Sequence, residues 1–185
     1  AKFSENKKFL MNIPLFNRLF ESKKIEHAVA DFTNLLIMEM DFSDKRSFLD
    51  EVQLVWREFS EGMEHISYSG VQVQRDYIRM HPEERIAAPI VFSCNLGVPL
   101  INKEFRDTFG DISYMISQTP QVWLDFQVFD MNDGLLMIWD GVDDLFPNGL
   151  LDEMFFCYKK ILYQIINQRE WESIIPIDIK EQIKS

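Results

Sequence analysis

Residues 117–130, SQTPQVWLDFQVFD, decide the fold class of this chain. After the turn-prone Thr119-Pro120 pair the side chains alternate in character, and a period of two predicts a β-strand. One side of the predicted strand carries two amides, an indole and a carboxylate: Gln121, Trp123, Asp125 and Gln127. The opposite side is apolar throughout: Val122, Leu124, Phe126 and Val128. The apolar side is therefore suited to burial against helices.

Asp125 is the unusual residue of this strand, because aspartate in the middle of a strand runs against β-propensity. Exceptions of this kind often mark functional sites. The alternative is a half-exposed strand whose polar side meets water, since alternation is common in sheets with one solvated face. Both interpretations stay open on the pattern alone.

The remaining sequence supplies further strands and helices. Apolar runs predict strands at 9–17, 32–40, 88–96 and 135–139. Apolar residues at helical spacing predict helices at 44–64 and 69–80, a helical turn at 103–109, and a last long helix after Pro147-Asn148-Gly149. Strands and helices are mixed and no internal repeat occurs. The predicted fold class is therefore α/β or α+β, with a mixed sheet covered by helices.

Four local features give sharper expectations. Pro14 in the first strand predicts an edge position or a bulge, because proline has no N–H for a sheet ladder. The strand at 32–40 is mostly apolar, which predicts burial on both faces. Ser43 or Asp44 is expected to cap the helix that follows. MNDG at 131–134 predicts a tight hairpin between two antiparallel strands.

Composition excludes several classes of protein. The chain has 185 residues, of which 46% are hydrophobic, with 16 Phe and 4 Trp, so one domain or one large lobe with a proper core is expected. The net charge of −11 argues against nucleic acid or an anionic membrane surface as a partner, because both require clustered Lys and Arg.

The two cysteines bear on the compartment. Cys94 and Cys157 lie in apolar runs, which predicts buried free thiols in a reducing cytoplasm. No CxxC or Cys/His cluster occurs, so no zinc site is predicted. The N-terminus has no long apolar run of the secretory kind, and the longest uncharged stretch, 86–102, is too short for a membrane span. The start at Ala1 suggests a piece of something longer.

Three stretches carry motifs in a fixed order: ADFTNLLIM at 30–38, APIVFSCNL at 88–96 and SQTPQVWLDFQ at 117–127. They resemble, in turn, the Gly/Ala-Asp-Phe-Thr motif, the Pro-Val-Val-Phe-Thr-Ser motif and the signature of heterocyclization domains of nonribosomal peptide synthetases. MNIPLFNR at 11–18 and LLMIWDGVDDLFPNGLLDEMF at 135–155 also fit. Three ordered motifs with their flanks make this resemblance specific, and it covers nearly the whole chain.

The resemblance implies a two-lobed domain. Such domains have two lobes, each like chloramphenicol acetyltransferase, with a tunnel at their junction. The chain resembles the C-terminal lobe over 1–170, and 171–185 is predicted as a linker-like tail. The family's Asp-rich motif belongs to the other lobe and has no counterpart here. The histidines are isolated and are assigned no role: His27, His65 and His81.

The resemblance also implies a reaction and a pair of site residues. The family joins a carrier-bound acyl or peptidyl thioester to Cys, Ser or Thr on the next carrier, then cyclises the side chain and removes water, giving a thiazoline or oxazoline. Ring closure needs a base for the nucleophile and an acid for the departing oxygen. Asp125 and Ser93 are the residues implied, although the family usually has Thr at the position of Ser93 and His at that of Phe126.

Other polar residues receive weaker interpretations. Gln121 and Trp123 share the predicted face of Asp125, so either a tunnel-lining or a structural role is open. Asp31 is interpreted as a cap for local backbone amides. A third group forms an acidic run near a helix start, where solvation and compensation of the helix dipole are favoured over metal binding: Asp140, Asp143 and Asp144.

Three hypotheses follow for the function of the chain. The first is the C-terminal lobe of a heterocyclization enzyme, the second an ordinary condensation-type or inactive relative, and the third a lobe that only docks carrier proteins. The implied partners are the N-terminal lobe, peptidyl carrier proteins and an adjacent adenylation domain. No cofactor is expected in this chain, because the phosphopantetheine arm arrives on the carrier. One lobe cannot complete a tunnel, so the isolated chain is expected to be inactive, and its exposed junction face predicts self-association.

Overall fold

A computed structural model describes residues 3–16, 28–83, 88–97, 100–117, 119–131, 134–168 and 171–174. The chain divides into two compact units. Unit 1 comprises Ala1–Phe9, Glu39–Glu61 and Val142–Ser185, and unit 2 comprises Leu10–Met38 and Gly62–Gly141. Unit 2 contains most of the sheet and all four residues that the sequence assigns to the site.

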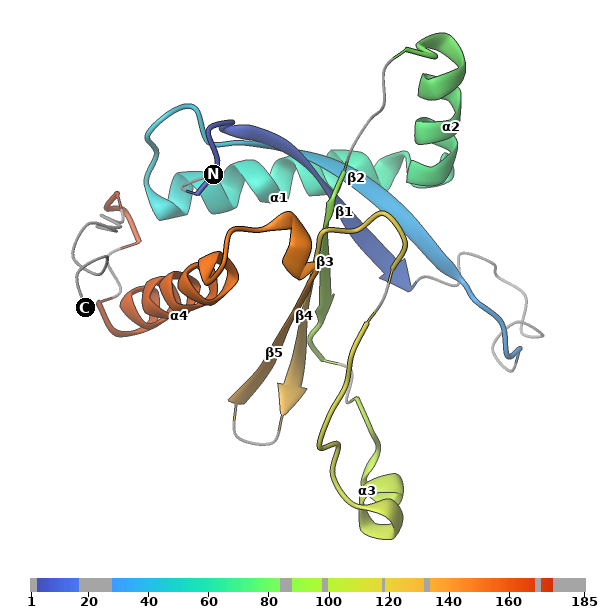
Figure 1. Cartoon of the computed structure of the whole chain (residues 1–185), viewed down its shortest axis with the longest axis vertical. Helices are drawn as coiled ribbons and strands as arrows, with labels where there is room; N and C mark the ends of the chain where they lie inside the picture. The colour runs from blue at the N-terminus through green and yellow to red at the C-terminus, as the bar shows by residue number, and fades with distance from the viewer. Residues whose placement is uncertain are drawn as a thin grey trace. The chain divides into compact units, whose positions relative to one another are not determined.

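The sheet has five strands in the order β2-β1-β3-β4-β5 (Figure 1). Their bounds are Lys8–Phe16 for β1, Thr33–Asp41 for β2, Ile90–Asn95 for β3, Leu124–Met131 for β4 and Gly134–Gly141 for β5. β3 runs parallel to both β1 and β4, whereas β4 and β5 are antiparallel and form the predicted hairpin. The predicted mixed sheet is therefore confirmed.

The prediction that the second strand is buried on both faces is wrong, because one face of β2, the edge strand, has no buried residue. Met38 and Met40 are buried on one face, while Glu39 between them is exposed. On the other face, the start of α2 approaches the strand closely at one point. A Cβ placed on Gly70 would come within 2.8 Å of the carbonyl oxygen of Leu35. The apolar run thus reflects one buried face plus one close approach from a neighbouring helix.

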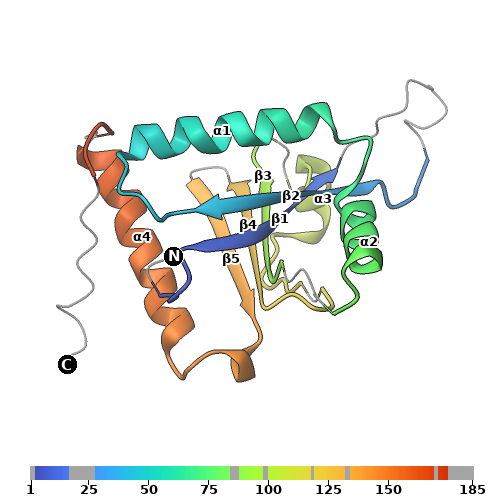
Figure 2. The same cartoon turned by 90° about the horizontal axis from the view of Figure 1, so that it is seen from above.

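Pro14 does not mark an edge strand, because β1 lies between β2 and β3 (Figure 2). The described pairing of β1 with β3 joins Met11 to Ile90 and Asn12 to Val91. These pairs precede Pro14, so the missing N–H of Pro14 costs none of these ladder bonds. The expectation of an edge was wrong since it assumed that the ladder runs the length of the strand.

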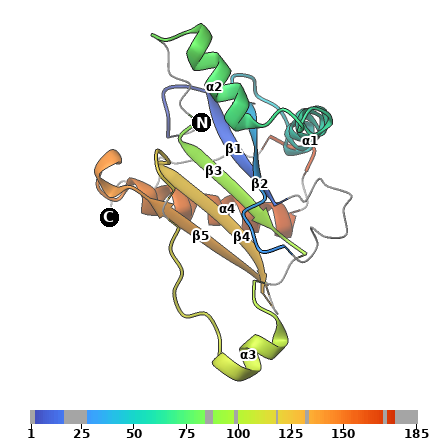
Figure 3. The same cartoon turned by 90° about the vertical axis from the view of Figure 1, so that its right-hand side faces the viewer.

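Four α-helices and one 3-10 helix lie in the described ranges: α1 Phe48–Glu64, α2 Gly70–Met80, α3 Lys103–Phe109, η1 Asp143–Leu145 and α4 Leu150–Gln168. α2 begins one residue after the predicted start, and Ser69 is its cap. The Ser69 hydroxyl accepts from the Gln72 N–H at 3.3 Å, and the Gln72 side chain accepts from the Ser69 N–H at 2.9 Å. None of the described helices is long and apolar enough to cross a membrane. In unit 2, α3 projects beyond the ends of β3 and β4 (Figure 3).

α1 begins four residues later than predicted. The Ser47 hydroxyl accepts from the Asp50 N–H at 3.1 Å and takes the capping role expected of Ser43 or Asp44. Asp44 is instead paired with Arg46 at 2.9 Å. The cap is therefore Ser47, which the sequence analysis did not name, and neither of the two expected residues caps the helix.

The first turn of α1 is completed within unit 1 by the residues that follow α4. The Leu49 N–H donates to the carbonyl of Trp171 at 2.8 Å, and the Phe48 N–H donates to that of Ser173 at 3.4 Å. Amides at a helix start have no partner within the helix, so these carbonyls satisfy two of them. The described beginning of the predicted tail is therefore bonded to α1, while residues 175–185 lie outside the described part.

An ion pair joins the ends of β1 and β2 that belong to unit 1. Lys8 Nζ lies 2.7 Å from Asp41 Oδ2, and the Ser43 N–H donates to Asp41 Oδ1 at 2.9 Å. The Lys8 hydrogen bond, followed by those of Ser43, holds the pKa of Asp41 well below its ordinary value. The same bond raises the pKa of Lys8.

Both cysteines are free, but they are not both buried as predicted. Cys157 is half-buried, and Cys94 is exposed. Cys94 follows Ile90 and Phe92 on one face of β3, and both of these are half-buried. The residues of this face are thus shielded from solvent only over the first part of the strand. An apolar run in the sequence cannot indicate where that shielding stops.

Candidate functional site

Ser93 and Asp125 lie on adjacent parallel strands with their side chains on the same face of the sheet. Val91 of β3 is aligned with Asp125 of β4, and Ser93 is aligned with Gln127. Residues two apart on a strand share a face, so the alignment places Ser93 and Asp125 together. The two residues that the resemblance implies as a pair therefore lie on neighbouring strands and share a face.

The same face gathers every buried polar side chain of the described residues: Asn12 is 8% exposed, Ser93 6% and Asp125 4%. Asn12 joins them because it is aligned with Val91. Buried polar groups are costly unless they are paired, so three of them on one face form a polar site and not ordinary core. We call this face, with Gln127 and Asp140, the site face.

Asp125 is the electrostatic centre of the site face. Its Oδ2 accepts from the Gln127 side-chain amide at 3.2 Å, while its Oδ1 has no hydrogen-bond partner among the described residues. Asp140 of β5 stands directly opposite Asp125 in the antiparallel ladder. A buried carboxylate with one neutral donor and a second carboxylate across the ladder is an arrangement that costs stability. Such a cost is typical of a site kept for its chemistry.

Gln127 separates Ser93 from Asp125. The step of two residues along the strand and one strand across gives a Cα separation of about 8 Å between Ser93 and Asp125. Gln127 is aligned with Ser93 and bonds Asp125, so it lies between the two. The sequence placed Gln127 on this face but gave it no role. Its contact with Asp125 is the feature that alternation alone does not reveal.

Asn12 is the residue that the sequence analysis missed. Its side-chain amide donates to the carbonyl of Ala88 at 2.9 Å, and its Oδ1 has no partner among the described residues. The available signal was a lone amide between Met11 and Ile13 in an apolar strand. Its place beside β3 depends on a contact between distant parts of the chain.

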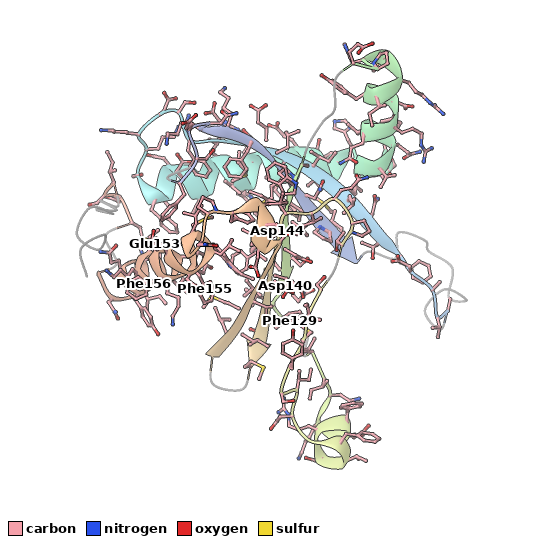
Figure 4. All side chains as sticks on the ribbon, viewed as in Figure 1. Phe129, Asp140, Asp144, Glu153, Phe155 and Phe156 are labelled. Carbon is pink, nitrogen blue, oxygen red and sulfur yellow. The ribbon has the colours of Figure 1, made fainter. Side chains whose placement is uncertain are left out.

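The predicted acidic run is split by the structure. Asp143 and Asp144 lie in η1, whereas Asp140 lies on β5, where Figure 4 labels it together with Phe129 of the site face. Asp140 Oδ2 accepts from the Ser117 N–H at 2.8 Å. This hydrogen bond therefore holds Ser117, the first residue of the 117–127 motif, against β5, the strand that pairs with β4.

The prediction that Gln121 and Trp123 belong to the same strand as Asp125 is wrong. β4 begins at Leu124, and Gln121 is exposed in a turn with a φ of 68°. The Trp123 side chain belongs to a residue that is 47% exposed, and the backbone N–H of Trp123 donates to the carbonyl of Pro89 at 2.7 Å. A tunnel-lining role for either residue stays a prediction, but it no longer follows from the alternation.

Asp31 forms the local cap that was predicted. Its Oδ1 accepts from the Thr33 N–H at 2.8 Å. Hydrogen bonds from Thr33 hold the pKa of Asp31 below its ordinary value. Asp31 therefore has a sufficient structural role just before β2.

Metal ligation has no support in the described ranges. No group of three His, Cys, Asp or Glu side chains comes together there as a metal site. Asp125 and Asp140 are two carboxylates, and the polar residues beside them are amides and a hydroxyl. The described side chains of the site face thus offer hydrogen-bond donors and acceptors from carboxylates, amides and a hydroxyl.

Comparisons with known proteins identify relatives over nearly the whole chain. No protein-family profile matches. Pyochelin synthetase PchE of Pseudomonas aeruginosa is 39% identical over 180 residues, which is 97% of this chain and 12% of the relative. Phenyloxazoline synthase MbtB of Mycolicibacterium paratuberculosis is 33% identical over 183 residues, 98% of this chain and 16% of the relative. The chain thus spans less than a fifth of these relatives.

Solved structures similar to this chain come from the same class of enzyme and identify its fold. The nonribosomal peptide synthetase FmoA3 matches with a TM-score of 0.81 at 26% identity, over 94% of this chain and 19% of that one. The EpoB cyclization-docking bidomain of Sorangium cellulosum matches with a TM-score of 0.75 at 28% identity, over 92% and 34%. The fold is accordingly the chloramphenicol-acetyltransferase-like fold of condensation-type domains. The chain therefore belongs to the condensation and cyclization domains of nonribosomal peptide synthetases, and it is homologous to parts of those enzymes.

Proposed function

We propose that this chain is the C-terminal lobe of a heterocyclization domain that converts a carrier-bound Cys, Ser or Thr amide into a thiazoline or oxazoline. The observation that carries the proposal is the buried Asp125 carboxylate on the same sheet face as the buried Ser93 hydroxyl. The motif order and the relatives named as a phenyloxazoline synthase and a cyclization bidomain support it.

Asp125 moves protons during ring closure. The side-chain X–H of the acceptor residue adds to the amide carbon, and Asp125 takes its proton while the carbonyl oxygen becomes a hydroxyl. The C–O bond then breaks, the N–H proton is lost, and a C=N bond forms. The oxygen leaves as water with the X–H and N–H hydrogens. Amide carbon is a poor electrophile, so this step depends on positioned proton transfer more than the preceding thioester attack does.

Gln127 and Ser93 support that role from neighbouring positions. The Gln127 amide donates to Asp125 Oδ2 at 3.2 Å and fixes the carboxylate, leaving Oδ1 for the substrate. Ser93 places a hydroxyl beside Gln127, where it holds the departing oxygen or its water. Serine lacks the methyl that restrains a threonine rotamer, so a threonine at this position would hold the hydroxyl more firmly.

The proposal assigns partners as well as chemistry. The N-terminal lobe completes the tunnel, peptidyl carrier proteins deliver both substrates on phosphopantetheine arms, and an adenylation domain loads the acceptor carrier. The two free thiols suit a reducing cytoplasm. In this proposal residues 1–185 alone turn over no carrier-bound substrate, and the face that meets the other lobe supports self-association of the isolated chain.

The test replaces Asp125 by Asn in the synthetase that carries this chain. Linear peptide accumulates on the carrier while ring formation falls by roughly 10²–10⁴-fold, the range typical of a lost general acid or base. Ser93→Ala acts in the same direction, and Ser93→Thr preserves or improves ring formation. Mass spectrometry of the carrier-bound product separates the two outcomes, because the ring is lighter by one water.

Asp107→Asn is the matched control, since Asp107 is an exposed carboxylate on α3 and its loss leaves both products unchanged. Loss of linear peptide with Asp125→Asn would assign the residue to structure or to the first step and favour an ordinary condensation domain. Unchanged amounts of both products would leave a carrier-docking lobe as the function.

A further inference from the structure

We propose that Gln121 binds the phosphopantetheine arm of the carrier, through its side-chain amide, as the arm reaches toward Asp125. The inference rests on the proposed function and names the residue that one of its partners contacts. In the turn before β4, the backbone of Gln121 has a φ of 68°. Every other described residue with a positive φ is a glycine: Gly97, Gly110 and Gly149. The chain therefore keeps a long side chain in a conformation for which it elsewhere uses none.

The turn at Gln121 has the hydrogen bond and the residue order of a type II turn. The Val122 N–H donates to the carbonyl of Thr119 at 3.2 Å, which puts Pro120 at the second position and Gln121 at the third. The third position of a type II turn requires a positive φ and is normally glycine or asparagine. A glutamine at this position therefore costs stability that a glycine would not cost.

Contacts on both sides of the turn hold this conformation in place. The Ser117 N–H donates to Asp140 Oδ2 at 2.8 Å, and the backbone N–H of Trp123 donates to the carbonyl of Pro89 at 2.7 Å. Because both flanks are fixed, the backbone of Gln121 cannot relax by shifting along the chain. Backbone strain of this kind gathers at functional sites, where the surrounding structure maintains it. The side chain of Gln121 is thus the feature for which a function is sought.

The Gln121 side chain is accessible to a ligand that approaches the start of β4. It is exposed and makes no hydrogen bond to a described residue. Trp123 is also exposed, whereas Leu124 and Asp125 are buried. The chain thus passes from solvent to the buried carboxylate within four residues, at most about 14 Å of extended chain. A ligand that approaches Asp125 from this end of β4 meets Gln121 before it reaches the carboxylate.

A glutamine amide matches the chemistry of the phosphopantetheine arm. The side chain is neutral, and it can donate through its N–H₂ group while it accepts through its carbonyl oxygen. The arm contains two secondary amides, and each of them offers one N–H and one carbonyl. A contact with the arm is the same whichever residue the arm carries. Gln121 should therefore serve amide formation and ring closure equally, in contrast to Asp125.

Two substitutions in the synthetase that carries this chain separate the side chain from the backbone. Gln121→Gly removes both the amide and the strain, whereas Gln121→Leu removes the amide and keeps the strain at a similar volume. At limiting concentrations of loaded carrier, we expect both variants to form product roughly ten-fold more slowly, as for the loss of one substrate hydrogen bond. The ratio of ring to linear product stays that of the parent, and saturating carrier restores the rate, because only binding is weakened.

Thermal unfolding of residues 1–185 supplies the contrasting readout. Gln121→Gly should melt about 2–4 °C above the parent because the strain is relieved, whereas Gln121→Leu should melt within about 2 °C of it. The variant that gains stability thus loses binding of the arm. Gln53→Leu, at an exposed glutamine of α1, is the control and should change neither the rate nor the melting temperature.

Two results would overturn the inference. Product formation that is unchanged in Gln121→Leu at limiting carrier would show that the amide binds nothing in either step. A slower rate that saturating carrier does not restore would assign the side chain to the fold or to a contact with the N-terminal lobe.

Asp125→Asn, measured in parallel, distinguishes the two levels of failure. If Asp125→Asn blocks ring formation and Gln121→Leu has no effect at limiting carrier, the role of Gln121 is wrong and the proposed function stands. If Asp125→Asn leaves the ratio of ring to linear product unchanged, the proposed function itself fails.

Discussion

Replacing Asp125 by Asn should make the chain more stable while it removes the proton transfer proposed for this carboxylate. The carboxylate is 4% exposed, accepts one bond from Gln127 and has an unpartnered Oδ1, and Asp125 is aligned with Asp140 in the ladder. In the variant, Oδ1 of the new amide takes the Gln127 bond, and its N–H₂ faces Asp140 as a donor. An unsatisfied buried acceptor costs about 1–3 kcal/mol, and that cost is relieved. For a chain of this length each kcal/mol shifts the melting temperature by about 2–4 °C, so a rise of about 2–12 °C is expected.

The assay is thermal and urea unfolding of residues 1–185, followed by circular dichroism at neutral pH. Glu5→Gln is the matched control, because it removes one exposed carboxylate from a chain with a net charge of −11 and tests whether charge reduction alone stabilises the fold. A melting temperature that falls, or that rises no more than in the control, would show that the buried carboxylate is compensated in solution. The burial of Asp125 would then carry no cost in stability.

Two further predictions concern stability away from the site. Asp41→Asn should lower the melting temperature at neutral pH, because the variant loses the ion pair with Lys8. The Lys8 pair holds the pKa of Asp41 in the folded state below its ordinary value of 3.8, so its stabilisation is lost on protonation and the difference in melting temperature between parent and variant should narrow below that pH. A difference that is constant with pH would contradict this. Gly70→Ala should lower the free energy of unfolding by roughly 1–3 kcal/mol instead of giving the usual gain of alanine in a helix, because its Cβ would lie 2.8 Å from the Leu35 carbonyl oxygen. Gly134→Ala is the control: its Cβ meets nothing within 4 Å, so urea unfolding should not show this loss.

The sequence predicted the parts of the site that lie within one strand or one motif. The resemblance implied Asp125 and Ser93 as a pair, and the alignment of β3 with β4 puts both side chains on one sheet face. The place of Asn12 in the site could not be predicted, because its partner strand begins at Ile90, far along the chain. A local pattern carries no information on which strands become neighbours.

The errors at the ends of elements have a common cause. Alternation continued from Asp125 back to Gln121, but the N–H groups of Trp123 and Leu124 both donate to Pro89, at 2.7 and 3.3 Å, and the strand starts only there. At the start of α1, the Ser47 hydroxyl accepts from the Asp50 N–H at 3.1 Å, so the helix begins after Ser47 and not after Ser43 or Asp44. In both places hydrogen bonds at the end of the element set the boundary, which periodicity cannot foresee.

The bonds from α1 to the residues after α4 have a consequence for how the chain folds during synthesis. The Leu49 N–H and the Phe48 N–H find their acceptors only at Trp171 and Ser173. At roughly 5–20 residues per second, the ribosome needs on the order of ten seconds to make the intervening ~120 residues. Until then the first turn of α1 lacks these acceptors and remains prone to fraying, so α1 is among the last helices that can be completed at its N-terminal end.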